Sequence, residues 1–90
     1  MSMIKLANIE VRGGLTLRLT FTDGRSGVWD AAAMLHSSDT PLTVPLRAPE
    51  AFARAFIEGG ALAWPNGLEI APWTLHAEMD AAGLLHKAAA

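Results

Sequence analysis

The chain has 90 residues, enough for one hydrophobic core but not for two, so we expect residues 1–90 to form a single domain. It contains no cysteine and no run of about 18 apolar residues, which excludes disulfide frameworks, cysteine-based metal sites and a membrane-spanning helix. Seven Lys and Arg residues against nine Asp and Glu residues give a net charge of −2 without any basic cluster. We therefore expect a cytoplasmic protein that contacts neither nucleic acid nor membrane directly.

The first third of the chain is predicted to be a three-stranded antiparallel meander. Residues 15–22 alternate between apolar and polar side chains, as a strand with one buried face does. Before them, the apolar residues lie at even positions in Ile4 and Leu6 but at odd positions in Ile9 and Val11. This change of face indicates a strand with a β-bulge near Ala7-Asn8. A glycine pair precedes residues 15–22 and Asp23-Gly24 follows them, so both reversals can be tight and a third strand runs over residues 25–29.

The middle of the chain is predicted to be helical. Asp30 precedes an alanine-rich run and can accept a hydrogen bond from the first turn of a helix over residues 31–35, after which residues 37–45 form a surface loop. A second helix begins at Pro49 and ends at Gly59-Gly60. Its phenylalanines lie at helical spacing, and we expect them to join the apolar face of the meander in one core. That core comprises Leu17, Leu19, Phe21, Phe52 and Phe56.

The last third is predicted to hold a second hairpin and a final helix. Residues 61–64 and 68–71 flank Pro65-Asn66-Gly67, which suits a type I turn closed by a glycine with positive φ. Thr74 is expected to cap the final helix, and residues 84–90 are expected to fray. The fold class is therefore α+β, with a small, mostly antiparallel sheet that combines the meander with the second hairpin and two to three helices packed on one face.

No catalytic, cofactor or metal site is predicted. The three histidines lack a recurring ligand spacing, and no glycine-flanked nucleophile or phosphate-binding glycine motif is present. Asp23 and Asp30 already have structural tasks at a turn and a helix start. Glu69 is different, because no local structural rule requires an acid there.

An interaction surface is predicted around the second hairpin. Three tryptophans are many for a chain of this length, and we expect two of them to be buried. Trp73, just after a proline at the start of a helix, is expected to be an exposed contact residue. The candidate surface comprises Trp64, Asn66, Glu69 and Trp73.

Three motifs occur in order along the chain: Phe21-Thr22-Asp23-Gly24, Leu-Arg-Ala-Pro-Glu-Ala-Phe over residues 46–52, and Trp64-Pro65-Asn66-Gly67. In this order they resemble the motifs of the small bacterial domain-of-unknown-function family 2442. The resemblance covers the chain from about residue 4 to about residue 76. The chain departs from the pattern of that family at Ala48, Glu69 and Trp73. The first change removes a helix cap worth about 1 kcal/mol, and the other two alter any shared surface site.

The resemblance implies no assigned activity. Members of this family look like partners in two-gene arrangements similar to toxin–antitoxin pairs, and longer relatives add a helix-turn-helix. This chain is expected to end before such a module, so that a DNA role would require an oligomer or another protein.

We therefore interpret the chain as a non-enzymatic protein-interaction module, an antitoxin-like partner of a small protein. A homodimer through a sheet edge or the C-terminal helix is expected, because Trp73 and Leu84-Leu85 would otherwise be exposed. The alternative is a small-ligand binder or enzyme with a site near Trp64 and Glu69. A pocket lined by both residues would favour that alternative.

Overall fold

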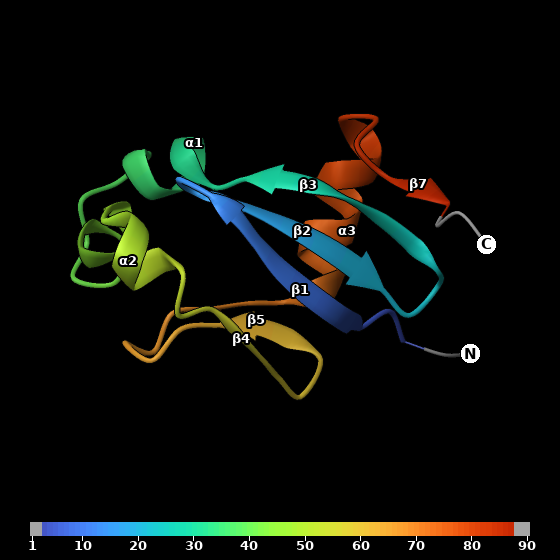
Figure 1. Cartoon of the computed structure of the whole chain (residues 1–90), viewed down its shortest axis with the longest axis horizontal. Helices are drawn as coiled ribbons and strands as arrows, with labels where there is room; N and C mark the ends of the chain where they lie inside the picture. The colour runs from blue at the N-terminus through green and yellow to red at the C-terminus, as the bar shows by residue number, and fades with distance from the viewer. Residues whose placement is uncertain (1–2, 88–90) are drawn as a thin grey trace.

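The computed structural model describes residues 3–87, which form an α+β fold with two antiparallel sheets (Figure 1). The first sheet has the strand order β1-β2-β3-β7. Its strands are β1 (Leu6–Gly13), β2 (Thr16–Phe21), β3 (Arg25–Asp30) and β7 (His86–Lys87). The predicted meander is therefore confirmed, and a short fourth strand from the far end of the chain extends it.

The details of the meander also follow the prediction. The register between β1 and β2 shifts between Leu6 and Asn8, which is the predicted bulge. At the reversal between β2 and β3, Gly24 has a φ of +86°, and the Asp23 carboxylate accepts a hydrogen bond from the Arg25 N–H at 3.0 Å. Alternation along β2 then places its apolar side chains on one buried face.

The second sheet has the strand order β4-β5-β6. Its strands are β4 (Phe56–Glu58), β5 (Ala61–Ala63) and β6 (Glu69–Ile70). The predicted hairpin between β5 and β6 is confirmed, since Gly67 has a φ of +101° and donates its N–H to the Trp64 carbonyl at 3.0 Å. It belongs to a sheet of its own, however, and not to the meander.

The predicted helix from Pro49 to Gly59-Gly60 is wrong over most of its length. The helix α2 (Pro49–Phe52) is a single turn, and Ala48 before it supplies no side-chain cap. Gly59 and Gly60 both have positive φ, +58° and +85°, as a two-residue hairpin turn requires, and they join β4 to β5. A glycine pair can end a helix or reverse a hairpin, and local spacing does not distinguish the two.

The remaining helices are α1 (Ala32–His36), the 3-10 helix η1 (Val44–Arg47) and α3 (Pro72–Ala81). The Asp30 carboxylate accepts the Ala32 N–H at 2.9 Å, which confirms its predicted role at the start of α1. The prediction that Thr74 caps the last helix is wrong. Proline fits the first helical position, so α3 already begins at Pro72.

The chain after α3 folds back onto β3. Gly83 has a φ of +71°, and the Leu84 N–H donates to the Met79 carbonyl at 2.8 Å, as in a Schellman motif. This reversal pairs His86–Lys87 with β3, within the segment 84–90 that was expected to fray. Residues 88–90 lie outside the described part of the chain.

Gly27 in β3 lies directly under this C-terminal return. A Cβ at position 27 would collide with the Leu84 carbonyl oxygen and would approach the Met79 methyl group to 3.1 Å. The φ of Gly27 lies outside the positive region, so space and not backbone conformation requires glycine here.

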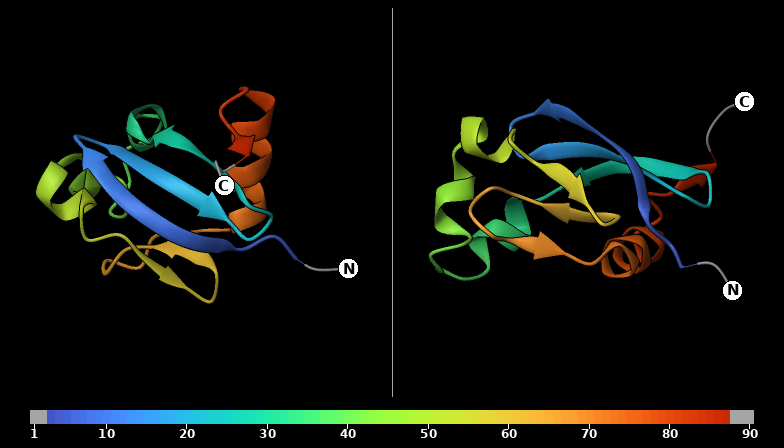
Figure 2. Two further views of the ribbon diagram at one scale, coloured as in Figure 1. Left: turned by 45° about the vertical axis from the view of Figure 1, so that its right-hand side comes forward. Right: turned by 90° about the horizontal axis from the view of Figure 1, so that it is seen from below.

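The molecule has two layers, which Figure 2 shows from below. The four-stranded sheet forms one layer, and the second sheet with α3 lies against one of its faces. A backbone hydrogen bond from the Leu6 N–H to the Gly60 carbonyl, 2.8 Å long, joins the two sheets. Between the layers lie the buried side chains of Leu6, Leu17, Leu19, Phe21, Trp29, Ala31, Leu35, Leu46, Phe52, Leu62, Trp64, Leu75 and Met79.

The two phenylalanines of the predicted second helix lie in different environments. Phe52 is 0% exposed, and its ring lies 5.5 Å from that of Trp64. Phe56 is 40% exposed, because alternation along β4 places it on the same face as the exposed Glu58, whereas Ile57 between them packs against the core. The expectation that Phe56 belongs to the core is therefore wrong.

Phe52→Ala should lower the free energy of unfolding by about 3–5 kcal/mol, because it leaves a cavity beside Trp64. Phe56→Ala is the matched control and should cost about 1 kcal/mol or less. Urea denaturation monitored by tryptophan fluorescence measures both. Equal losses would contradict the different positions of the two rings.

Candidate functional site

A groove of about 410 Å³ opens between the residues that precede β1, the turn between β4 and β5, strand β6 and the start of α3. We call it the Trp73 groove. It is lined by Met3, Lys5, Gly59, Ala61, Glu69, Ala71, Pro72 and Trp73. Two of the four residues predicted for the interaction surface, Glu69 and Trp73, therefore lie in one concave region.

The start of α3 explains why Trp73 faces outward. Ala71 is extended, with φ −62° and ψ 138°, and Pro72 occupies the first helical position. Leu75 and Met79 turn toward the core from the same helix. Trp73 lies two positions before Leu75 and so points to the other side, where it is 55% exposed, as expected from the sequence.

The groove carries one charge of each sign. Lys5 lies on its N-terminal side and is fixed at the backbone, where its N–H donates to the Thr22 hydroxyl at 3.1 Å. Glu69 lies on the opposite side, on β6, and both side chains are exposed. Within residues 3–87, neither side chain takes part in an ion pair. Both charges are thus available to a ligand.

Trp64 and Asn66 have structural positions. Trp64 is 2% exposed, and its indole N–H donates to the Phe52 carbonyl at 2.9 Å. The Asn66 side chain donates to the Leu42 carbonyl at 3.0 Å and accepts the Leu68 N–H at 3.1 Å. Trp64 is therefore buried and is not among the residues that line the Trp73 groove with Glu69, and Asn66 ties the β5–β6 turn to the loop over residues 37–45.

A pair that the sequence analysis missed lies beside the groove. His76 of α3 places Nε2 2.8 Å from the Asp23 Oδ2, and its ring meets the Phe21 ring edge-on at 5.0 Å. Burial acts to raise the pKa of Asp23, but the Arg25 backbone amide and the His76 ring together lower it below its usual value. The two residues are 53 positions apart, so no local spacing could have indicated the pair.

The arrangement is suited to binding. In the described part of the chain, no three potential metal-ligating side chains cluster. The Nδ1 of His36 is hydrogen-bonded to the Ala32 carbonyl of its own helix at 2.8 Å. No helix between residues 3 and 87 is both long enough and apolar enough to cross a bilayer. What the site offers is an exposed indole between a cation and an anion.

Comparison with known proteins gives a family and a structural neighbour. The model of the family described as Protein of unknown function (DUF2442) matches residues 6–89. Among solved structures, the chain is similar to "Putative DNA Binding Protein NE0471" from Nitrosomonas europaea ATCC 19718, with 27% sequence identity and a TM-score of 0.69. The match covers 90% of this chain and 52% of that one, so this chain spans about half the length of its neighbour. No curated protein matches.

The name of this neighbour contradicts the expectation that nucleic acid plays no direct part, and that expectation is withdrawn. It rested on the net charge of −2, but the total charge of a chain does not say how its charges are distributed over its faces. The homodimer expected from the sequence stays a prediction. Leu85 packs against the core, so that only Leu84 of the apolar C-terminal pair is exposed.

Asp23→Asn should lower the free energy of unfolding near neutral pH by about 0.5–1 kcal/mol, a small loss because the pair with His76 is partly solvent-exposed. The pKa of Asp23 is lower in the folded chain than its usual 3.8. Its contribution is therefore fully present above that pH and is lost as the pH falls through the folded-state pKa.

The difference between wild type and Asp23→Asn should accordingly shrink below about pH 4, as measured by urea denaturation across the acid range. Asp80→Asn is the control, because its carboxylate is exposed and lies 3.4 Å from Arg25. A difference that stays constant down to the acid transition would contradict the assignment.

Proposed function

This chain belongs to the DUF2442 family of proteins of unknown function, and we propose that it is a binding module that holds a partner protein through the Trp73 groove. The exposure of Trp73 carries the proposal. Large aromatic side chains at interfaces bury much surface at little entropic cost and often supply most of the binding energy. Met3 beside it is also exposed and adds a flexible apolar wall.

The two charges of the groove indicate the chemistry of the partner. A segment with an apolar anchor for Trp73, an acid toward Lys5 and a base toward Glu69 would complement it. Charges at the rim contribute more to orientation and association rate than to affinity. We therefore assign affinity to Trp73 and orientation to Lys5 and Glu69.

A small protein encoded beside this chain, as in an antitoxin-like pair, is the partner that we favour, and we place both in the cytoplasm. The alternative of a small-ligand site built from Trp64 and Glu69 is not supported. Trp64 lies in the core and Glu69 on the surface, so the two do not form the walls of one pocket.

Contact with DNA is the second candidate function. The observation in its favour is the structural neighbour, which is named as a DNA-binding protein and shares 27% identity with 90% of this chain. Such a contact is compatible with a partner in the Trp73 groove only if it uses another face of the molecule.

Trp73→Ala should weaken partner binding at least about thirtyfold, because truncation of an aromatic anchor costs roughly 2 kcal/mol or more. Its melting temperature should stay close to that of wild type, since the side chain is exposed. Tagged full-length chain is used to capture partners from native lysate, and calorimetry with the purified partner gives the affinity.

Val44→Ala is the matched control, because Val44 is an exposed apolar residue on η1 that does not line the groove. Glu69→Ala should lower the affinity only a few-fold. Because Trp29 and Trp64 are buried, the partner should also shift the emission of the exposed Trp73. A Trp73→Ala variant that retains every partner at wild-type affinity would refute the proposal.

A further inference from the structure

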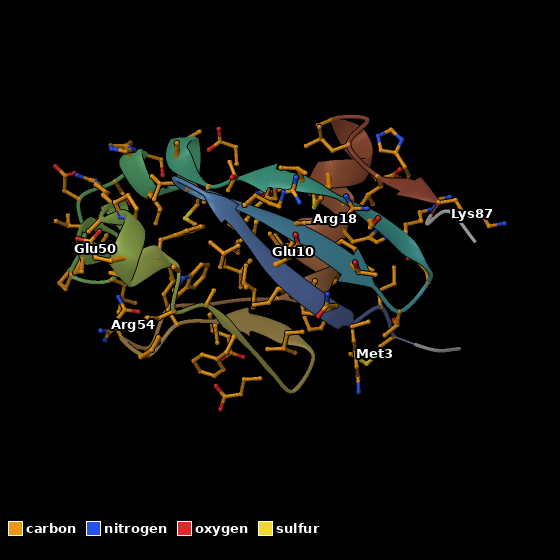
Figure 3. All side chains as sticks on the ribbon, viewed as in Figure 1. Met3, Glu10, Arg18, Glu50, Arg54 and Lys87 are labelled. Carbon is orange, nitrogen blue, oxygen red and sulfur yellow. The ribbon has the colours of Figure 1, made fainter. Side chains whose placement is uncertain are left out.

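The uncovered face of the four-stranded sheet carries a second groove, of about 420 Å³, where β7 joins β3. We call it the Arg18 groove. Arg18 and Ser26 lie on one side of it, and His86 and Lys87 lie on the other. No acidic residue contributes to its lining, in contrast to the Trp73 groove. Figure 3 labels Arg18 on the central part of this sheet and Lys87 at the end of β7.

Strand register assembles this groove from distant parts of the sequence. Thr20 pairs with Ser26 and Arg18 pairs with Val28, so Arg18 and Ser26 point to the same face of neighbouring strands. The return after α3 then places His86 opposite Ser26. The basic side chains are scattered in the sequence, which is why they form no cluster there.

Arg18 keeps most of its hydrogen-bonding capacity. Its one hydrogen bond to a residue of the described range is long, 3.4 Å from Nη2 to the Ser26 hydroxyl. A guanidinium has five N–H donors in a planar fork, which matches two oxygens of one phosphate group. Ser26 is buried and aims its hydroxyl at the same place.

Two carboxylates of the same sheet have other partners. Glu10 lies opposite Arg18 across the β1–β2 pair, but its Oε1 forms an ion pair with the Arg12 Nη1 at 2.9 Å. The carboxylate of Asp30 accepts the Ala32 N–H. Neither forms an ion pair with Arg18 between residues 3 and 87, so the guanidinium keeps N–H donors for a ligand.

We infer that the Arg18 groove binds a phosphate of a nucleic-acid backbone, with Arg18 as the bidentate donor and with the Ser26 hydroxyl and His86 on the same face of the sheet. The inference rests on DNA contact, the second candidate function, and gives it a place on the chain. The groove lies on an open sheet face, where a continuous strand can cross, whereas an enclosed pocket would favour a small phosphorylated molecule. It leaves the Trp73 groove free for a partner.

The test is fluorescence anisotropy of a short labelled DNA duplex with the full chain over a range of salt concentrations. Arg18→Ala should weaken binding about five- to tenfold at low salt and should reduce the slope of log K against log salt by about one. Arg18→Lys should restore part of the affinity. The matched control is Arg54→Ala, an exposed arginine at the opposite end of the molecule, which should bind like wild type (Figure 3).

The outcomes separate the site from the function. If wild type, Arg18→Ala and Arg54→Ala all bind the duplex equally well, DNA contact stands and the site is wrong. If wild type does not bind the duplex at low salt, the second candidate function fails and this inference fails with it. If inorganic phosphate or an acidic peptide shifts the Arg18 side-chain resonances but the duplex does not, the groove has a different anionic ligand and the inference is overturned.

Discussion

The contact between Trp64 and Phe52 is the interaction on which the second layer depends. The rings pack at 5.5 Å, and the indole N–H of Trp64 closes a hydrogen bond to the Phe52 carbonyl. The backbone of Trp64 also closes the β5–β6 turn, because its N–H donates to the Leu68 carbonyl at 2.9 Å. One side chain thus fixes the end of α2 to the strands that lead into α3. Only with this layer in place is the apolar face of β2 shielded from water.

Much of the fold could be predicted because the responsible signals are local. Alternation over residues 15–22 defines the central strand, and glycines at positions of positive φ define the reversals around Asp23-Gly24 and Gly67. The prediction of an element failed where one local sequence signal is compatible with two structures. Gly59-Gly60 ends a helix as readily as it reverses a hairpin, and the choice was made by pairing of β4 with β5. Strand β7 has only two residues and exists because β3 offers it an edge.

The candidate site could be predicted only in part, for a related reason. The exposure of Trp73 could be predicted, because it follows a proline at the start of α3 and lies off the helix face that Leu75 and Met79 turn toward the core. Lys5 and Met3 carry no local signal and reach the groove through the packing of β1 on the second sheet. Trp64 looked like part of the same surface because it is near in sequence, yet a strand alternates its faces and the turn directs the indole inward. Exposure and burial of neighbouring aromatics are decided by tertiary packing.

The close approach at Gly27 has a consequence for the order in which this sequence can change. A side chain at position 27 and the return of residues 84–87 to β3 exclude each other, because the Leu84 carbonyl occupies the place of the Cβ. Substitution of Gly27 becomes tolerable only after that return has been lost, so the two changes are epistatic and can accumulate in one direction only. Since both Gly27 and Leu84 line the Arg18 groove, a lineage that took this path would lose one wall of the groove before it gained a side chain in β3.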